Sequence, residues 1–416
     1  MTKLLELLPV DPADPLAILP ALEEALTGQR ALLPVPTNDP ARANLLRNTQ
    51  GVGEPIADDV ALVVATSGST GTPKGALLTP TNLIASADAT HQALGGPGQW
   101  LLAMPAAFIA GIQVLVRSMV AGVEPAFVDL THGFLVDEFA ARTAEIAATG
   151  DRCYTALTPL QLDKAMSTLT GIDALRSFDA VLVGGAATNP ALLDSATKLR
   201  INVVTTYGSS ETSGGCVYDG VPIAGANVRI RDGRIWLGGV YKRTALPAAA
   251  VPVGRPPPVA PAPYTPPRWG IRDGRIWLGG PMVARGYRNQ PEHPDFAEPG
   301  WFRTSDAGQL VDSHLTVEGR VDNVIDSGGL KLQPEVLERF LLRVPGVADA
   351  CVVGVPDERF GQRICAAFAG EAQVPDVMDA LQDLPRWQVP KELKRVAALP
   401  LLGPGKVDRS AVRDLF

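Results

Sequence analysis

The sequence has 416 residues, which is long enough for more than one domain, because single hydrophobic cores usually stop growing at about 250–300 residues. Hydrophobic residues make up 46% of the chain and charged residues 19%, a balance typical of folded globular proteins rather than disordered ones. The formal net charge of −7 argues against a general binder of nucleic acids or anionic membranes, which needs a basic surface.

The cysteines and the N-terminus both favour a cytoplasmic protein. The spacing of the four cysteines fits neither a metal site nor a disulfide framework: Cys153, Cys216, Cys351 and Cys365. The N-terminal residues MTKLLELLPVDPADP carry acidic residues and prolines where a secretory signal has an unbroken apolar core. The apolar stretch Leu101–Gly122 is interrupted by Pro105 and Arg117, so it predicts buried strand and helix and no membrane span.

Apolar runs alternate with helical patterns through the first half of the chain, which indicates parallel strands covered by helices. Val60–Thr66 predicts a buried strand, and Gly75–Thr79 is a second, shorter apolar run. Thr79 is suited to cap a helix that begins at Pro80 and that Gly95 can end. These segments predict an α/β fold.

A second unit of the same kind lies further along the chain. Ala180–Gly185 predicts a strand, Asn189 opens a helix, and Asn202–Glu211 predicts the next strand. Loops that follow such strands lie at the carboxyl edge of the sheet, where open α/β folds bind ligands. The loops at residues 66–75 and 207–212 are therefore candidate ligand-binding segments.

The sequence IRDGRIWLGG occurs twice, at Ile230–Gly239 and at Ile271–Gly280. Two copies are too few for a solenoid, which indicates a local duplication. Residues 240–270 are rich in proline, so we expect an extended or disordered surface segment there. We predict that the second copy forms the strand leading to Gly286–Asn289, whereas the first copy could pair as an extra edge strand.

Beyond Gly319 the pattern changes to that of a small α+β unit. Its predicted elements are two helices and three strands: helix Pro334–Leu342, strand Ala350–Val355, strand Arg363–Ala369, helix Val374–Leu384 and strand Leu393–Ala398. We therefore expect two domains: a large N-terminal domain of α/β layers with mixed sheets over residues 1–321, and a small mobile α+β C-terminal lid over residues 322–416.

The segment TSGSTGTPKG, at Thr66–Gly75, combines glycines, hydroxyl side chains and a lysine, which together can wrap a polyphosphate. It differs from the loop of nucleotide hydrolases because Lys74 follows a proline and precedes a strand. A polar surface turn is the alternative. The residues expected to bind the phosphates are Thr66, Ser67, Gly68, Ser69, Thr70, Gly71 and Lys74.

Four further motifs follow this loop in order: YGSSET at 207–212, WFRTSDAG at 301–308, GRVDNVIDSGGLKLQPEVLE at 319–338 and GPGKVDR at 403–409. Together the five motifs resemble the adenylate-forming superfamily of acyl-CoA synthetases, adenylation domains and luciferases. The resemblance covers nearly everything from Asp58 to the C-terminus, except the repeat and its proline-rich insert. It implies a ligase that uses ATP, Mg²⁺ and CoA to convert a small carboxylic acid first to an acyl-AMP and then to a thioester.

The resemblance assigns roles to the second motif. Tyr207 matches the aromatic residue that stacks on adenine, with Gly208 beside it; taken alone, Tyr207 would be a core tyrosine. Glu211 matches the glutamate associated with Mg²⁺, a cation that prefers carboxylate oxygen, and Thr212 joins it among the expected catalytic residues. Taken alone, Glu211 would be a solvated surface acid.

The later motifs supply the rest of the implied site. Asp306 matches the aspartate that binds the ribose hydroxyls, since a carboxylate only accepts hydrogen bonds; a turn cap is the alternative. Arg320 matches an arginine that contacts the nucleotide, and Asp322 the hinge of the lid, with a surface ion pair between them as the alternative. Lys406 matches the lysine that bridges the attacking carboxylate and the α-phosphate. The residues implied to line the CoA tunnel are Gly328, Gly329 and Lys331.

Two segments bear on the acid. Ser210–Gly225 and Ala110–Gly122 are similar to the actinobacterial o-succinylbenzoate–CoA ligases of menaquinone biosynthesis. This similarity implies that Ser213, Gly214 and Gly215 line the acyl pocket. Arg117 would contact a substrate carboxylate or ketone, or would be structural. Phe108 stands where the family usually has a histidine that contacts or gates the acyl site, which leaves the acid open.

Three hypotheses follow for function. The first is an o-succinylbenzoate–CoA ligase, and the second is an acyl- or aryl-CoA synthetase with a different acid. The third is a catalytically impaired nucleotide-binding remnant, suggested by Phe108 and by the insert. The presence of all five key side chains argues against a remnant: Lys74, Glu211, Asp306, Arg320 and Lys406. The resemblance also leaves a homodimer open.

Overall fold

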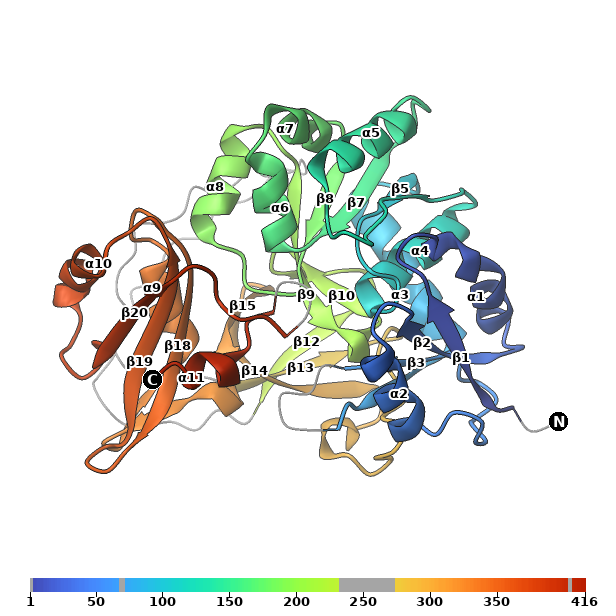
Figure 1. Ribbon diagram of the computed structural model, residues 1–416. Helices are drawn as coiled ribbons and strands as arrows, with labels where there is room; N and C mark the ends of the chain where they lie inside the picture. The colour runs from blue at the N-terminus through green and yellow to red at the C-terminus, as the bar shows by residue number, and fades with distance from the viewer. Residues whose placement is uncertain (1–2, 67–71, 232–273, 403–405) are drawn as a thin grey trace.

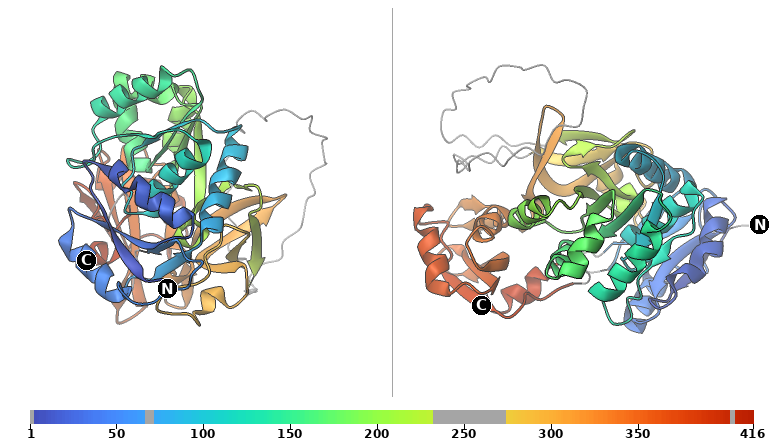
Figure 2. Two further views of the ribbon diagram at one scale, coloured as in Figure 1. Left: turned by 90° about the vertical axis from the view of Figure 1, so that its right-hand side faces the viewer. Right: turned by 90° about the horizontal axis from the view of Figure 1, so that it is seen from above.

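A computed structural model describes residues 3–66, 72–231, 274–402 and 406–416 of the chain. The described residues form mixed α/β layers with four sheets, three in a large N-terminal part and one in a smaller C-terminal unit (Figure 1). The predicted α/β class with a small C-terminal unit is therefore confirmed. Seen from above, the C-terminal unit lies at one end of the molecule and the N-terminal strands at the other (Figure 2).

The first sheet has the order β1-β2-β3-β4. Its strands and the two helices around them are β1 (Leu5–Val10), α1 (Leu19–Leu26), β2 (Ala31–Pro36), α2 (Pro40–Thr49), β3 (Leu62–Ala65) and β4 (Gly75–Leu78). The first three strands are parallel, whereas β4 pairs antiparallel with β3 from Leu62↔Leu78 to Ala65↔Gly75. The glycine-rich loop therefore connects two antiparallel neighbours.

The central sheet has seven strands in the order β11-β10-β9-β8-β7-β5-β6. They are β5 (Gln99–Leu102), β6 (Ala126–Phe127), β7 (Cys153–Leu157), β8 (Ala180–Val183), β9 (Val203–Ser209), β10 (Gly214–Tyr218) and β11 (Val221–Pro222). The five strands β5 to β9 are parallel, as the alternation of apolar runs and helices predicts, and β10 and β11 add antiparallel pairs. This sheet carries the 207–212 motif at the end of β9.

Six helices cover the two faces of the central sheet. They are α3 (Pro80–Leu94), α4 (Ile109–Ala121), α5 (Val136–Ala147), α6 (Pro159–Met166), α7 (Leu169–Arg176) and α8 (Pro190–Lys198). Because side chains alternate along a strand, Trp100 and Leu102 enter the core formed with α3 and α4, whereas Leu101 enters the core formed with α5 to α8. The buried strand and helix predicted for residues 101–122 are both present.

Predicted caps fix the start of two helices. The Thr79 hydroxyl accepts a hydrogen bond from the Asn82 N–H at 3.1 Å, and the Asn82 side chain accepts one from the Thr79 N–H. Gly95 ends α3 with φ +90°, a conformation that glycine adopts without strain. Asn189 caps α8 by accepting from the Ala191 N–H.

The third sheet is antiparallel and has the order β12-β13-β14-β15. Its strands are β12 (Asn227–Arg231), β13 (Gly274–Gly279), β14 (Trp301–Val311) and β15 (His314–Arg320). The second copy of the repeat forms β13, between β12 and β14, as predicted. The first two residues of the first copy end the edge strand β12, where Ile230 pairs with Ile276. The rest of the first copy and the proline-rich residues 240–270 lie outside the described residues.

The C-terminal unit has its own sheet and hydrophobic core, drawn from Ile325 onward. Its elements are β16 (Ile325–Ser327), β17 (Leu330–Leu332), α9 (Pro334–Leu341), β18 (Val347–Asp357), β19 (Gly361–Gly370), α10 (Val374–Ala380), β20 (Glu392–Val396) and α11 (Arg409–Arg413). The elements α9, β18, β19, α10 and β20 follow the predicted order, whereas β16, β17 and α11 were not predicted. The buried carboxylate of Glu338 accepts from Arg409, which ties α11 to α9.

The four cysteines are all buried free thiols. Among the described residues, no helix combines the length and the apolar character needed to cross a bilayer.

Candidate active site

The glycine-rich loop begins and ends at a backbone hydrogen bond. The Thr66 N–H donates to the Lys74 carbonyl at 2.8 Å, which brings the two ends of the loop together. The expected phosphate ligands Ser67, Gly68, Ser69, Thr70 and Gly71 lie outside the described residues. Lys74 is described, and its side chain points to a cluster from a distant part of the chain, with Nζ 3.0 Å from His293 Nε2.

Tyr207 and Asp306 meet between two sheets. Tyr207 lies near the end of β9, and its hydroxyl donates to Asp306 Oδ2, in β14, at 2.7 Å. The register of β14 and β15 places Asp306 opposite Arg320. A Cβ at Gly208 would lie 2.2 Å from the Gly214 carbonyl, so glycine is required for β9 and β10 to pair this closely. The structure therefore brings three of the expected nucleotide-binding side chains together.

Burial has the largest effect on the pKa values of Asp306 and Tyr207. It raises the pKa of Asp306 above its ordinary value, while the Tyr207 hydrogen bond and the Arg320 charge oppose the rise. Burial, together with the Asp306 charge, raises the pKa of Tyr207 well above its ordinary value. Tyr207 is therefore a neutral donor at physiological pH, and it leaves lone pairs of Asp306 to accept further hydrogen bonds.

Arg320 pairs with Asp322 in this structure. Its Nε and Nη2 donate to the two carboxylate oxygens of Asp322 at 2.9 and 2.6 Å, and both side chains are partly exposed. This is the ion pair that the sequence offers as the alternative to a nucleotide contact. Asp322 belongs to a short 3-10 turn, Val321–Asn323, that directly precedes the C-terminal sheet. The pair therefore lies at the junction of the two parts of the chain.

Glu211 is buried in the 3-10 turn Ser210–Thr212. Its Oε1 accepts a hydrogen bond from the Tyr287 hydroxyl at 2.7 Å. Thr212 stabilises this turn, because its hydroxyl accepts a hydrogen bond from the Ser209 N–H and lies 2.8 Å from the Gly214 carbonyl. The sequence motifs assign no role to Tyr287. Its segment, Gly286–Asn289, is identified from the sequence only as the one to which the strand of the second repeat copy leads.

Lys406 lies close enough to four charged side chains for its charge to interact with theirs: Asp306, Arg320, Asp322 and Glu211. Burial lowers the pKa of Lys406, the Arg320 charge lowers it further, and the charges of Asp322, Asp306 and Glu211 oppose the change. The Leu402 N–H donates to the Lys406 carbonyl at 2.7 Å. Residues 403–405, the Gly-Pro-Gly that precedes Lys406, lie outside the described residues. The structure thus brings Lys406 into the same charged environment as Asp306 and Arg320.

Arg117 is buried on α4. Its Nη2 lies 3.5 Å from the Tyr218 hydroxyl, its guanidinium is 5.0 Å from the centre of the Trp100 indole, and burial lowers its pKa. Within the described part of the chain, Nε has no hydrogen-bond partner. Phe108 precedes α4, and the Arg42 guanidinium stacks 5.1 Å from its ring centre.

Of the residues expected to line the acyl pocket, Ser213 directly precedes β10, and Gly214 and Gly215 are its first two residues. Ser213 has φ +53° and donates its hydroxyl to the Met282 carbonyl at 2.9 Å. A Cβ at Gly214 would lie 3.4 Å from the Gln113 side chain on α4, and one at Gly215 would lie 3.1 Å from both Thr206 and Tyr218. The three residues therefore share a region with the buried guanidinium of Arg117.

The contacts described for the residues implied to line the CoA tunnel do not include Asp306, Arg320, Glu211 or Lys406. Gly328 and Gly329 form the exposed two-residue turn of the β16–β17 hairpin, and Lys331 is exposed on β17. The Gly328 N–H donates to the Phe360 carbonyl and the Gly329 N–H to Asp326, both within the C-terminal unit.

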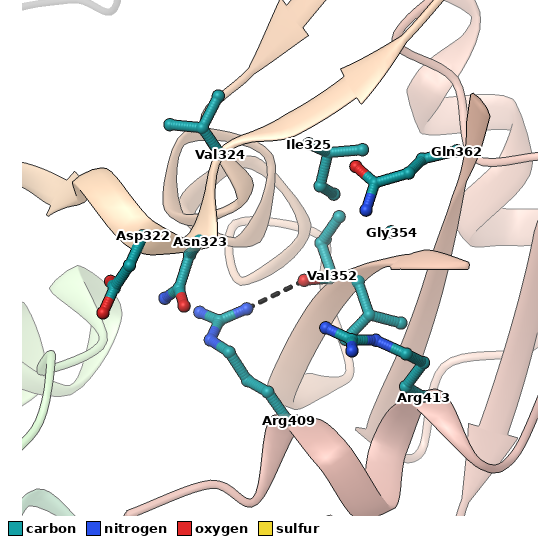
Figure 3. Close-up of a pocket in the computed structure, with 10 residues that line it drawn as sticks. Asp322, Asn323, Val324, Ile325, Val352, Gly354, Gln362, Arg409 and Arg413 are labelled. Atoms are coloured by element: carbon teal, nitrogen blue, oxygen red, sulfur yellow. Dashed lines mark hydrogen bonds between the residues drawn. The ribbon is translucent and has the colours of Figure 1, made fainter. Parts of the chain in front are cut away.

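A cavity of about 90 Å³ lies beside the junction and is lined by Asp322, Asn323 and Arg409 among others. Figure 3 shows Asn323 beside the Arg409 guanidinium, which donates to the Val352 carbonyl. Ligand pockets usually measure about 300–1,000 Å³, so this cavity is too small for a nucleotide.

No group of three or more His, Cys, Asp or Glu side chains suited to a metal ion occurs in the residues that the structure describes. Glu211 nevertheless fits Mg²⁺, which is usually bound through one or two carboxylates together with phosphate oxygens and water. The hydrogen bond described for this carboxylate uses only Oε1.

The chain belongs to the AMP-binding enzyme family. The family model described as "AMP-binding enzyme" matches residues 10–288, and the one described as "AMP-binding enzyme C-terminal domain" matches residues 336–406. A Mycobacterium tuberculosis protein named "Probable 2-succinylbenzoate--CoA ligase" is 43% identical over 96% of this chain and 95% of its own length.

Solved structures share the fold. An o-succinylbenzoate CoA synthetase from Bacillus subtilis, in complex with the acyl-adenylate intermediate OSB-AMP, aligns with a TM-score of 0.75 at 21% identity over 99% of this chain and 88% of that one. The same Bacillus subtilis enzyme in complex with ATP and magnesium ion also aligns with a TM-score of 0.75 at 21% identity, over 98% of this chain and 89% of that one.

Proposed function

We propose that this protein is an ATP-dependent acid–CoA ligase that converts o-succinylbenzoate to o-succinylbenzoyl-CoA, a step of menaquinone biosynthesis. The observation that carries the proposal is the convergence of Asp306, Arg320, Glu211 and Lys406, which come from both parts of the chain, in one charged cluster. The Mycobacterium tuberculosis relative supports the reaction and the acid.

In the first step, the acid's carboxylate attacks the α-phosphate of ATP, forms acyl-AMP and releases pyrophosphate. Tyr207 would stack on adenine while Asp306 accepts hydrogen bonds from the ribose hydroxyls. The Lys406 ammonium would offset the negative charge of the two reacting groups as they approach. Glu211 would hold Mg²⁺, which neutralises phosphate charge when it is bound, and Lys74 would bind the outer phosphates. Positioning and charge neutralisation thus supply most of the catalysis.

In the second step, the thiol of CoA attacks the acyl carbon and AMP leaves. We propose a boundary between residues 321 and 322, with the C-terminal unit turning about Asp322 between the steps. This movement would withdraw Lys406 and bring in Gly328, Gly329 and Lys331 to line the CoA tunnel. The exposed position of that hairpin and the partly exposed Arg320–Asp322 pair at the junction are consistent with such a rotation.

The acid would bind near Ser213, Gly214 and Gly215, with Arg117 facing a carboxylate or ketone of the substrate. Burial of the Arg117 guanidinium without a carboxylate hydrogen-bond partner among the described residues favours an anionic ligand, because a buried charge needs compensation. Phe108 replaces the histidine usual in the family and so bears on the choice of acid.

The remaining proposals concern the protein's surroundings. Its partners are small molecules rather than nucleic acid, in line with the negative net charge, and a homodimer remains a proposal drawn from family members. A cytoplasmic location is proposed from the four free thiols, which fit a reducing compartment.

The decisive experiment measures AMP formation with ATP, Mg²⁺, CoA and o-succinylbenzoate. We expect AMP release that depends on the acid and on CoA. A flat trace with o-succinylbenzoate, beside turnover of another carboxylic acid from a panel, would favour the second candidate, an acyl- or aryl-CoA synthetase for that acid. Phe108 is the observation that keeps this second candidate open. Binding of ATP without turnover of any acid would indicate a nucleotide-binding remnant.

A further inference from the structure

Lys74 is held by residues far from the glycine-rich loop. Its Nζ lies 3.0 Å from His293 Nε2, 3.9 Å from Asp295 Oδ2 and 4.9 Å from the centre of the Tyr287 ring. Lys74 and His293 are 219 residues apart in the sequence. The loop alone therefore does not fix the position of this ammonium group.

The chemistry of the two groups sets the direction of their hydrogen bond. A lysine ammonium only donates, so His293 Nε2 accepts, and the proton of the neutral ring then lies on Nδ1, 3.4 Å from Asp295 Oδ2. The Asp295 N–H also lies 3.2 Å from Nδ1, a contact that belongs to the other tautomer. Burial lowers the pKa of His293, which favours the neutral ring that is able to accept.

Asp295 forms a long ion pair with Lys74 and no direct hydrogen bond to it. Its Oδ1 accepts from Arg303 Nε and Nη2, each at 3.2 Å, while its Oδ2 is 3.9 Å from the ammonium and beyond hydrogen-bond distance. A hydrogen-bonded ion pair would compete with a phosphate for the ammonium more strongly than this longer pair and the neutral acceptor of His293 do. Holding a side chain before its ligand arrives also lowers the entropic cost of binding.

Tyr287 connects this arrangement to the carboxylate proposed to hold Mg²⁺. Its ring meets His293 edge-on at 4.9 Å, and its hydroxyl donates to Glu211 Oε1 at 2.7 Å. Lys74 is expected to bind the phosphates and Glu211 to hold their Mg²⁺. Both therefore contact the same aromatic side chain, Tyr287.

We propose that His293 is a positioning residue for triphosphate binding: its imidazole holds the Lys74 ammonium over Tyr287, where the β- and γ-phosphates of ATP arrive. The inference rests on the proposed function, because it takes Lys74 as a phosphate ligand. AMP lacks the two outer phosphates, so its binding needs neither His293 nor Lys74.

The test measures dissociation constants for ATP with Mg²⁺ and for AMP by calorimetry, without acid or CoA, in the full chain. The variants are H293L, H293Q, K74M and the double variant H293L/K74M. Leucine removes the acceptor, whereas the glutamine side chain presents an amide oxygen near the position of Nε2. Exposed His132 provides the control H132L, for which we expect no change.

We expect H293L to weaken ATP binding about tenfold, the size of one misplaced charge-assisted hydrogen bond, and to leave AMP binding unchanged. H293Q restores most of the affinity, and H293L adds nothing once Lys74 is methionine. Equal losses for ATP and AMP, a further loss on the K74M background, or unchanged ATP binding in H293L would each overturn the proposal.

Failure of the proposed function and failure of the His293 proposal give different results. A wild-type protein that binds neither nucleotide would refute the proposed function itself, independently of His293. If H293L does not fold, H293N replaces it, because asparagine keeps a polar side chain but is too short to reach Lys74. The same ATP-specific loss is then expected, and its absence would overturn the proposal.

Discussion

Asp306 and Lys406 belong to one candidate site, but the chain holds them in different ways. Asp306 lies within the eleven-residue strand β14, which pairs with β13 on one side and β15 on the other, and its carboxylate accepts a hydrogen bond from Tyr207. Lys406 lies three residues before α11, and an ion pair between α11 and α9 anchors that helix. The nucleotide side is thus built on a rigid sheet, and the lysine side on a unit joined through a short junction.

This difference fits a two-step reaction. AMP is present in both steps, so the groups that bind it belong on elements that do not move. In the proposed mechanism Lys406 is needed only while the acid meets the α-phosphate, so it belongs on a segment that can move away. A change on the nucleotide side should therefore affect both steps, whereas a change at Lys406 should affect only the first.

The largest expected effect comes from Lys406→Ala. Loss of the ammonium removes charge stabilisation from the adenylation step, so we expect pyrophosphate exchange to fall about a thousandfold. Thioester formation from supplied acyl-AMP and CoA should be largely spared. Exposed Lys198→Ala, on α8, is the control and should change neither rate. Equal loss of both steps in K406A would contradict the division between the two sides.

The next effect is an alkaline loss of adenylation. The pKa of Lys406 is lowered from 10.5, chiefly by burial, so the ammonium loses its proton at a lower pH than a free lysine. Adenylation therefore declines as pH rises through this lowered pKa, by about tenfold per pH unit beyond it. A pH profile of pyrophosphate exchange measures the decline. In K406R, whose guanidinium stays charged, the remaining activity should lack it; the same decline there would point to another group.

Tyr207→Phe tests the nucleotide side. It removes the donor to Asp306 Oδ2, and leaving a partly buried acceptor unpaired costs about 1–3 kcal/mol, or roughly tenfold in affinity. We expect weaker ATP binding in a titration and slower rates in both steps. Tyr154→Phe is the matched control, because the Tyr154 hydroxyl also donates in the core, to the carbonyls of Leu94 and Gly96. An effect of Y207F on one step alone would argue against a shared nucleotide side.

The smallest effect on activity is expected from deleting residues 233–273. Arg231 pairs with Arg275, so the deletion leaves Asp232 and Gly274 as a two-residue Asp-Gly loop, a strongly favoured hairpin turn. The strands beside Asp306 keep their partners. We expect pyrophosphate exchange within about twofold of wild type, since the sheet is unchanged, and a higher melting temperature, since loop closure costs less. A variant that no longer binds ATP would show that the deleted segment supports β13.

Local patterns in the sequence were sufficient to predict many elements. Thr79 and Asn189 cap helices because capping depends on residues within one turn, and the β8–α8–β9 unit follows from apolar runs separated by a helix. The N-terminal strands β1 and β2, by contrast, were not assigned. The repeat left two arrangements open, because both copies carry the same side chains, and the register of β13 with β14 decided between them.

The order of the five motifs determined the family and the reaction class, because each motif places particular chemical groups at short, fixed spacings. Long-range packing decided the rest. Only the tertiary structure sets Tyr287 against Glu211 and places His293 beside Lys74. These contacts join segments whose meeting depends on how whole sheets and loops pack, and no local spacing encodes that.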